Sequence, residues 1–303
     1  MYAVKHIEKN GLRFLELQNP YESSRLSICL DQGGRLDELV LKNTSVLADF
    51  SVSDYQSKYQ SAILFPFVGR IKDGRYHFND ENYQLTCNEV DKNNALHGLV
   101  YNKKFEYVKS ELKNDIGIVV LRYRQTERQS GFPFKYTIEL IYELRKDNLS
   151  LKLSVKNEDV AEFPFSLGWH PYFKSSNLDC SHLYFDSDEK FIFDERLVPE
   201  KRLKLKTKMP FEFKNIKLDD CYLLKSNKVH LFTPDYQLKL IVSSKKIFLQ
   251  LYTPERQNTI AIEPMTGPAN NFNNKINLKV LKPNEIYVIE WTVSIHSIKK
   301  ETN

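Results

Sequence analysis

Apolar and polar residues alternate along much of this 303-residue chain, so that every second side chain is apolar over long segments. The clearest segments are residues 136–144, 149–156 and 287–295. A period of two places successive side chains on opposite faces of a strand, whereas an amphipathic helix needs apolar residues three and four positions apart. No helical pattern of that kind continues for more than two turns. We therefore predict an all-β fold, a sandwich or barrel, with large sheets packed face to face.

Composition supports a folded β protein. Hydrophobic residues make up 41% and aromatic residues 13% of the chain, which is enough apolar material for a sizeable core. No stretch of 18 consecutive apolar residues is present, so we expect no membrane span. The first ten residues lack the apolar core of a secretory signal, so we expect a cytoplasmic protein. Because no Gly-, Ser- or Pro-rich linker divides the chain, we predict one domain over residues 1–303.

Charge and cysteines give little sign of nucleic-acid or metal binding. The net charge is +5, and the densest basic run covers residues 201–208. The run alternates, so we expect a strand with Leu203 and Leu205 facing inward and the lysines facing water, not a nucleic-acid site. The four cysteines lie far apart in the sequence, which argues against a structural zinc site, and we expect reduced thiols.

Four segments do not fit a purely structural interpretation, because each combines prolines, glycines or aromatic residues with one polar group. They are residues 65–75, 93–98, 163–173 and 261–272, and their polar groups are Arg70, His97, His170 and Glu263. Taken singly, each histidine is more often a hydrogen-bonded core residue, and the glutamate more often a solvated strand end. Taken together, the four groups could line one pocket that binds a polyol and transfers protons, because histidine and glutamate can act as complementary acid and base.

Other chemistries have less support. No pair of histidines has the spacing of a metal site on one strand or helix, and neither nucleotide-binding glycine loop is present. The nucleophile elbow of acyl-transfer enzymes is also missing. We therefore expect no metal and no organic cofactor.

At these residues the sequence resembles the aldose 1-epimerase (galactose mutarotase) family. The matching motifs occur in the family's order over nearly the whole chain: FPFVGRI at 65–71, ALHG at 95–98, GWHPYF at 168–173 and AIEP at 261–264. The resemblance implies a large antiparallel β-sandwich, the galactose mutarotase-like supersandwich. It also implies an isomerase of carbohydrate metabolism that interconverts the α and β anomers of a free hexose without a cofactor.

The resemblance further implies a role for each site residue. Glu263 matches the family's catalytic base and His170 its catalytic acid, while Arg70 and His97 match residues that hold the sugar near its ring oxygen. A further family aspartate binds sugar hydroxyls, and its counterpart is Asp219, with Asp220 as the alternative. The aromatic side chains that flank these groups are expected to shape the sugar pocket: Phe67, Trp169 and Tyr172.

The sugar itself stays open, because residues 264–268 (PMTGP) differ from the Pro-Gln that usually follows the family's glutamate. A hexose 6-phosphate would need a cationic cluster, to which Lys72 or Arg75 could contribute. A carbohydrate-binding or sensing protein without turnover is another alternative. A glycosidase or lyase would need a second pocket carboxylate near Glu263, for which only Asp219 and Asp220 are candidates.

Overall fold

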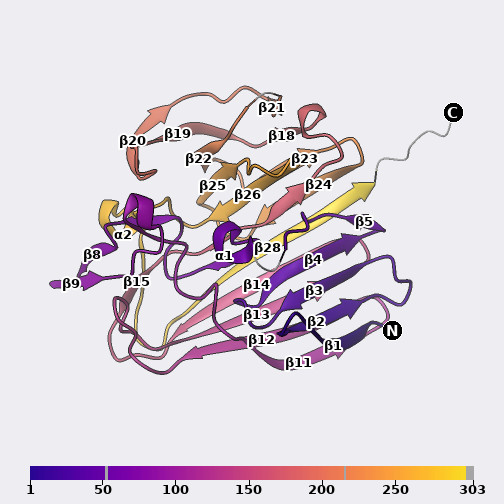
Figure 1. Cartoon of the computed structure of the whole chain (residues 1–303), viewed down its shortest axis with the longest axis horizontal. Helices are drawn as coiled ribbons and strands as arrows, with labels where there is room; N and C mark the ends of the chain where they lie inside the picture. The colour runs from indigo at the N-terminus through magenta and orange to yellow at the C-terminus, as the bar shows by residue number, and fades with distance from the viewer. Residues whose placement is uncertain (52–53, 215, 298–303) are drawn as a thin grey trace.

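Antiparallel strands form nearly all of the regular structure, as the alternation predicts. The computed structural model describes residues 1–51, 54–214 and 216–297, and each strand pairing within them is antiparallel. Three large sheets make up most of the molecule (Figure 1).

The largest sheet has nine strands. Its long C-terminal strand β28 lies in the middle of the sheet, between β14 and β24. In spatial order its strands are β11 (Glu106–Leu112), β12 (Gly117–Gln125), β13 (Tyr136–Leu144), β14 (Asn148–Asn157), β28 (Ile286–Ser297), β24 (Tyr236–Val242), β23 (Lys228–Phe232), β18 (His182–Tyr184) and β21 (Phe211–Glu212).

The second sheet has eight strands. In spatial order they are β20 (Pro199–Lys204), β19 (Ser187–Phe193), β22 (Asp219–Leu224), β25 (Ile247–Tyr252), β26 (Thr259–Met265), β16 (Gly168–Trp169) and β6 (Ile63–Leu64), and β17 (Tyr172–Lys174) also pairs with β26. The third sheet follows chain order: β1 (Ala3–Lys9), β2 (Leu12–Gln18), β3 (Arg25–Cys29), β4 (Arg35–Leu41) and β5 (Thr44–Ser45).

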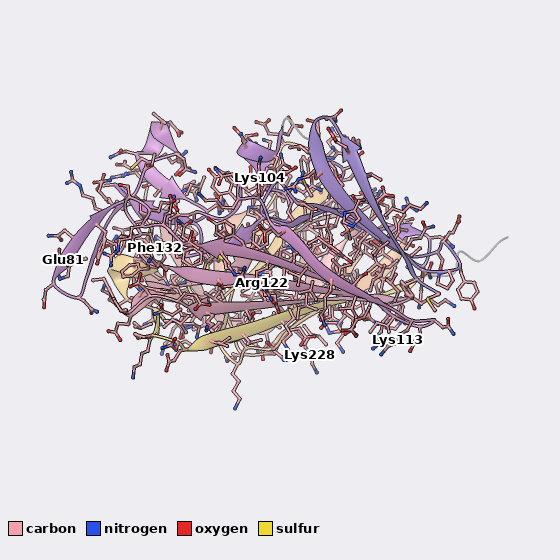
Figure 2. All side chains as sticks on the ribbon, turned by 90° about the horizontal axis from the view of Figure 1, so that it is seen from below. Glu81, Lys104, Lys113, Arg122, Phe132 and Lys228 are labelled. Carbon is pink, nitrogen blue, oxygen red and sulfur yellow. The ribbon has the colours of Figure 1, made fainter. Side chains whose placement is uncertain are left out.

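Short elements connect the large sheets. Three two-stranded ladders are β7 (Arg70–Lys72) with β10 (Asn94–Leu96), β8 (Arg75–Phe78) with β9 (Glu81–Gln84), and β15 (Phe163–Phe165) with β27 (Lys279–Leu281). The helices are single turns: α1 (Tyr55–Lys58), α2 (Asn271–Asn274), η2 (Val90–Lys92) and η3 (Leu178–Cys180). Seen from below, Glu81 projects at one end of the molecule, where β8 and β9 form a hairpin (Figure 2).

One buried apolar cluster joins the three sheets. It includes Leu17 of the five-stranded sheet, Leu140 of the nine-stranded sheet and Leu249 of the eight-stranded sheet. The ring centroids of Trp169 and Trp291 are 6.2 Å apart, so the eight-stranded and nine-stranded sheets meet at these two buried side chains. Along β13, buried and half-buried residues alternate strictly, which matches the period-two pattern read from the sequence.

The strand expected within the basic run is present as β20, which ends at Lys204, but the inward orientation predicted for Leu203 and Leu205 is wrong. Leu203 is 46% exposed and Leu205 is 47% exposed. Leu203 lies on the outermost strand of its sheet, where residues of both faces are exposed, and Leu205 lies just beyond the end of that strand. No helix in the described residues is long and apolar enough to cross a membrane.

Candidate active site

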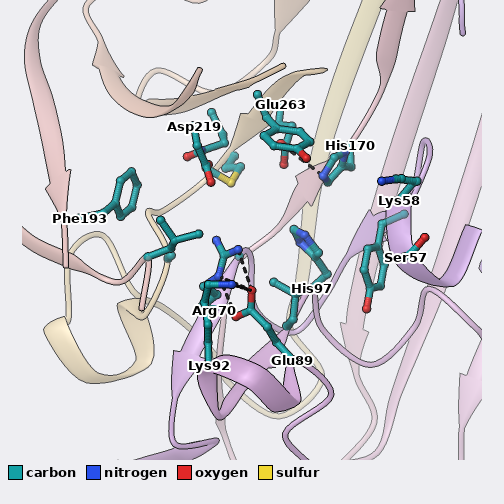
Figure 3. A pocket seen from close by; sticks show the side chains of 18 of the residues that line it. Ser57, Lys58, Arg70, Glu89, Lys92, His97, His170, Phe193, Asp219 and Glu263 are labelled. Atoms are coloured by element: carbon teal, nitrogen blue, oxygen red, sulfur yellow. Dashed lines mark hydrogen bonds and ion pairs between the residues drawn. The ribbon is translucent and has the colours of Figure 1, made fainter. Parts of the chain in front are cut away.

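A cavity of about 350 Å³ brings together polar residues from all four segments singled out in the sequence. Arg70, His97, His170 and Glu263 all line it, together with Asp219 (Figure 3). The remaining lining residues come from α1, the loops next to β7 and β10, and the eight-stranded sheet: Ser57, Lys58, Tyr59, Gly69, Glu89, Lys92, Leu96, Tyr172, Phe193, Leu197, Gln250, Tyr252, Met265 and Ala269.

Strand register places three of the polar groups on one face of the eight-stranded sheet. Glu263 on β26 lies opposite Gln250 on β25, and the next residue along that face, Tyr252, lies opposite Asp219 on β22. Cross-strand partners and residues two apart share a face of a sheet. Gln250 therefore reaches Asp219, and its Nε2 donates to Asp219 Oδ1 at 2.6 Å.

His170 lies where Pro171 separates β16 from β17. Its backbone is fixed on both sides, because its N–H donates to the Ala62 carbonyl at 3.1 Å and its carbonyl accepts from the Ser61 N–H at 2.8 Å. The imidazole stacks on the Tyr172 ring, with centroids 4.9 Å apart. Its Nε2 then lies 3.3 Å from Oε1 of Glu263.

The Glu263–His170 pair is almost completely buried, and burial shifts both pKa values toward the neutral forms. Burial, together with a smaller effect of the positive charge of Arg70, lowers the pKa of His170 to about 4. Burial raises the pKa of Glu263 well above its ordinary value, and the nearby Asp219 carboxylate adds to this, while Arg70 opposes it. At pH values between these two shifted pKa values the pair therefore holds one proton between two atoms 3.3 Å apart, which is the property of an acid–base couple.

His97 follows β10 with a left-handed backbone, φ +61°, and its N–H donates to the Gly69 carbonyl at 2.8 Å. The next residue, Gly98, also has positive φ, and a Cβ there would lie 2.3 Å from the Phe65 carbonyl oxygen, so only glycine fits. The His97 ring meets the His170 ring at 5.0 Å. Burial lowers the pKa of His97 well below its ordinary value, so the imidazole is neutral.

Arg70 begins β7, and its guanidinium forms a two-point pair with Glu89. The Glu89 carboxylate was not identified in the sequence, because a single glutamate in a turn-rich segment looks like any solvated residue. Gln250 was also missed, although one polar residue within the apolar strand FLQLY (248–252) is a usable signal. Both residues line the cavity.

The two candidate aspartates occupy different environments. Asp219 lines the cavity, whereas Asp220, the next residue of β22, faces away and pairs with Lys190, Oδ1 to Nζ at 2.7 Å. Burial raises the pKa of Asp219, with Arg70 acting in the opposite direction. Of the two, Asp219 has the location expected of a sugar ligand.

The expectation for the flanking aromatic residues was only partly right. Tyr172 lines the cavity, but Phe67 and Trp169 lie in the core, with exposures of 1% and 0%. Trp169 directly precedes His170, and neighbouring residues of an extended chain point in opposite directions, so only one of them can face the cavity. Phe67 instead packs against Phe272, with ring centroids 6.0 Å apart.

The described residues contain no group of three or more His, Cys, Asp or Glu side chains arranged to hold a metal ion. Their cysteines are free thiols, of which Cys29 and Cys221 are buried, Cys87 is half-buried and Cys180 is exposed.

Known proteins are similar to this chain in sequence or in fold. The family model described as Aldose 1-epimerase matches residues 13–294. The uncharacterized protein YihR of Escherichia coli K12 is 23% identical over 84% of this chain and 86% of its own length.

A galactose mutarotase-like protein from Clostridium acetobutylicum has a TM-score of 0.86 and 22% identity, covering 98% of this chain and 99% of its own. Galactose 1-epimerase from Lactobacillus acidophilus NCFM has a TM-score of 0.80 and 18% identity, covering 98% and 99%. The galactose mutarotase-like fold is therefore shared, and the chain belongs to the aldose 1-epimerase family.

Proposed function

We propose that this protein is an aldose 1-epimerase, an isomerase that interconverts the α and β anomers of a free hexose. The observation that carries the proposal is the buried Glu263–His170 pair, 3.3 Å apart in a cavity that also presents Arg70, His97 and Asp219. The cavity volume of about 350 Å³ lies at the small end of the range for ligand pockets, which suits a monosaccharide.

The reaction needs one proton acceptor and one proton donor across the C1–O5 bond of the sugar. Glu263 removes the proton from the anomeric hydroxyl, and His170 donates its proton to the ring oxygen as the C1–O5 bond breaks. The open aldehyde rotates about its C1–C2 bond and closes on the other face. On closure His170 takes the proton back from the O5 hydroxyl while Glu263 returns one to O1, so no proton is gained or lost.

The two protonation states of the pair correspond to the two halves of this cycle. The cyclic sugar requires ionised Glu263 and protonated His170, whereas the open aldehyde requires the neutral acid and the neutral imidazole. Burial favours the neutral state, and the attraction between opposite charges 3.3 Å apart favours the ionised one. Because these effects oppose each other, neither the ionised nor the neutral state of the pair is strongly favoured. Glu263 and His170 can therefore each take up and give back a proton.

The other polar groups bind and orient the sugar. Arg70 carries a fixed positive charge and can stabilise negative charge that develops on the ring oxygen. His97 is neutral and contributes one hydrogen bond instead of a second charge. Asp219, held by Gln250, accepts hydrogen bonds from sugar hydroxyls.

Polarimetry tests the proposal directly. Freshly dissolved α-D-glucose and α-D-galactose should reach equilibrium rotation faster with the protein than without it, and α-linked nitrophenyl hexosides should not be hydrolysed. If no free or phosphorylated aldose equilibrates faster, the protein is not an epimerase. Saturable sugar binding without acceleration would instead favour a binding or sensing protein, and hydrolysis would favour a glycosidase.

A hexose 6-phosphate is the second candidate substrate, and the observation that favours it is Lys58. This lysine lines the cavity from α1 and has no ion-pair partner among the described residues. Lys72 and Arg75 are less suitable, because Lys72 pairs with Asp194 and Arg75 bonds to Gln84. Comparing kcat/KM for glucose and glucose 6-phosphate distinguishes the two substrates, and Lys58→Ala should weaken only the phosphorylated one.

A further inference from the structure

The position of the Arg70 guanidinium is determined by one carboxylate that the proposed proton transfer does not use. Arg70 Nε lies 2.9 Å from Oε2 of Glu89, and Arg70 Nη2 lies 2.9 Å from Oε1, so two parallel hydrogen bonds fix the plane of the guanidinium. Its Nη1 forms no hydrogen bond with the described residues and stays available to a ligand. The carboxylate thus occupies the Nε and Nη2 side of the guanidinium, and Figure 3 shows this pair joined by dashed lines in the cavity wall.

Glu89 is itself held in place by Asn94. The two residues are joined by backbone hydrogen bonds in both directions, each 3.1 Å, and η2 forms the turn between them. The side chain of Asn94 is fully buried, and its Nδ2 donates to Glu89 Oε2 at 2.8 Å. Asn94 begins β10, which pairs with β7, so Arg70 and its partner belong to one small hydrogen-bonded unit.

A second connection links this unit to the β19–β20 hairpin. Asn94 Nδ2 also donates to the Arg196 carbonyl at 3.0 Å. The Arg196 guanidinium donates to the carbonyls of Lys92 and Asn93, at 2.8 Å each, and to Asp73 Oδ1 at 3.0 Å. These contacts do not involve Arg70 and fix the turn that carries Glu89, so the position of the carboxylate does not depend on the guanidinium alone.

The charge of Glu89 persists despite its location in the cavity wall. Burial alone would raise the pKa of Glu89, but the hydrogen bonds from Arg70 and Asn94 outweigh burial and lower the pKa. The side chains of Arg70 and Glu89 are 17% and 10% exposed, so water screens the pair only weakly. Such a pair resists rearrangement, because moving either charge leaves the other buried without a partner.

We propose that Glu89 is a positioning residue, which acts on the sugar only through Arg70 by holding the guanidinium at the angle required for contact with the ring oxygen. This inference rests on the proposed function for its effect on turnover, but not for its effect on the position of Arg70.

The kinetic test compares Glu89→Gln with Glu38→Gln. Glutamine keeps the shape of Glu89 but can accept only one of the two hydrogen bonds from Arg70, so kcat/KM for the best sugar should fall about tenfold. Glu38 forms the same two-point pair with Arg25, at 3.1 and 2.8 Å, on the five-stranded sheet. Its substitution should leave kcat/KM within a factor of about two.

A double-mutant cycle tests whether Glu89 acts through Arg70. In an Arg70→Met background, Glu89→Gln should no longer lower kcat/KM, because the guanidinium it positions is gone. Equal losses from Glu89→Gln in the wild-type and Arg70→Met backgrounds would overturn the proposal.

Crystal structures of the wild-type protein and Glu89→Gln provide a measurement that does not depend on turnover. The Arg70 guanidinium should be displaced or adopt two conformers in the variant, and an unmoved guanidinium would overturn the proposal. If the wild-type protein accelerates no sugar and Arg70 still moves in Glu89→Gln, the proposed function fails while the positioning role stands. If Glu89→Gln cannot be purified folded, Asn94→Ala, which removes one donor to Glu89 Oε2, replaces it in both experiments with the same expected outcomes.

Discussion

The acid–base pairs on two walls of the cavity differ in their protonation: one pair is shifted toward the neutral forms, and the other stays charged. On the wall formed by the eight-stranded sheet and the segment around His170, buried Glu263 and His170 have pKa values shifted toward neutrality. On the wall formed by the β7–β10 ladder, Arg70 and Glu89 stay ionised, because each compensates the other through two hydrogen bonds. Both walls contain an acid and a base, yet the two pairs behave differently.

The difference is explained by hydrogen-bond count and geometry. The Glu263–His170 contact is a single contact of 3.3 Å, so the cost of burial is not fully offset and the proton can change place. The Arg70–Glu89 pair adds a third bond from Asn94 to the carboxylate, so its charges are fixed. In the proposed reaction the first wall transfers protons and also presents Asp219 to the sugar, while the second wall holds the charge of Arg70 in place.

The largest effect is expected when the groups proposed to transfer protons are removed from the first wall. Glu263→Gln and His170→Asn should each lower kcat by about 10²–10⁴-fold, because each removes one proton transfer. Polarimetry measures the loss. Wild-type rates in both variants would show that the first wall does not perform the chemistry.

Thermal unfolding supplies the control for the same variants. Because burial shifts Glu263 toward its neutral form, Glu263→Gln, which keeps that shape and charge, should leave Tm nearly unchanged, even though activity is lost. A large fall in Tm would mean that the carboxyl group supports the fold, and the kinetic loss could then no longer be assigned to proton transfer.

The pH profile of kcat/KM sharpens the comparison. The active form of the pair carries one proton. Because the pKa of His170 is lowered to about 4, a second proton binds only near and below pH 4, and activity should fall there. Because the pKa of Glu263 is raised, the last proton leaves only at a pH well above the ordinary value of 4.5, which gives the alkaline limb. Initial rates corrected for spontaneous mutarotation measure both limbs, and an acid limb near 6.5 would contradict this assignment.

The smallest effect is expected at the sugar hydroxyls. Asp219→Asn should raise KM about tenfold, because the carboxylate held by Gln250 loses its charge as an acceptor. Asp220→Asn is the matched control on the neighbouring residue, which faces Lys190 outside the cavity, and KM should change by less than about twofold. The opposite ranking of the two variants would mean that Asp220 is the sugar ligand.

The fold was largely predictable from the sequence because strand periodicity is local. Alternation in segments such as 136–144 directly reports which side chains face the core. Alternation does not report burial on a strand that lacks a core on either face, as for Leu203 on the outermost strand. The order of strands in space, with β28 between β14 and β24, depends on contacts between residues distant in sequence. No local sequence pattern indicates it.

The candidate site could be predicted only where a residue stands out from its surroundings. His170 and Glu263 are conspicuous because they lie within apolar, proline-containing segments. Glu89 lies in a polar turn, and its importance arises from the ladder that brings it to Arg70. The prediction that Phe67 and Trp169 line the pocket was wrong, because residues close to a site residue in sequence need not lie on the same face.

The central position of β28 has a consequence for how the site comes into existence. Until residues 286–297 are available, β14 and β24 are two unpaired edges, and the nine-stranded sheet is divided into two parts. Because β28 follows all the other described strands in the sequence, it is synthesised after them, and the sheet behind Trp169 and the cavity cannot be completed before then. Formation of the cavity therefore depends on a strand that is made after the others it pairs with, and a chain interrupted before residue 286 would expose two unpaired sheet edges instead of a finished sheet.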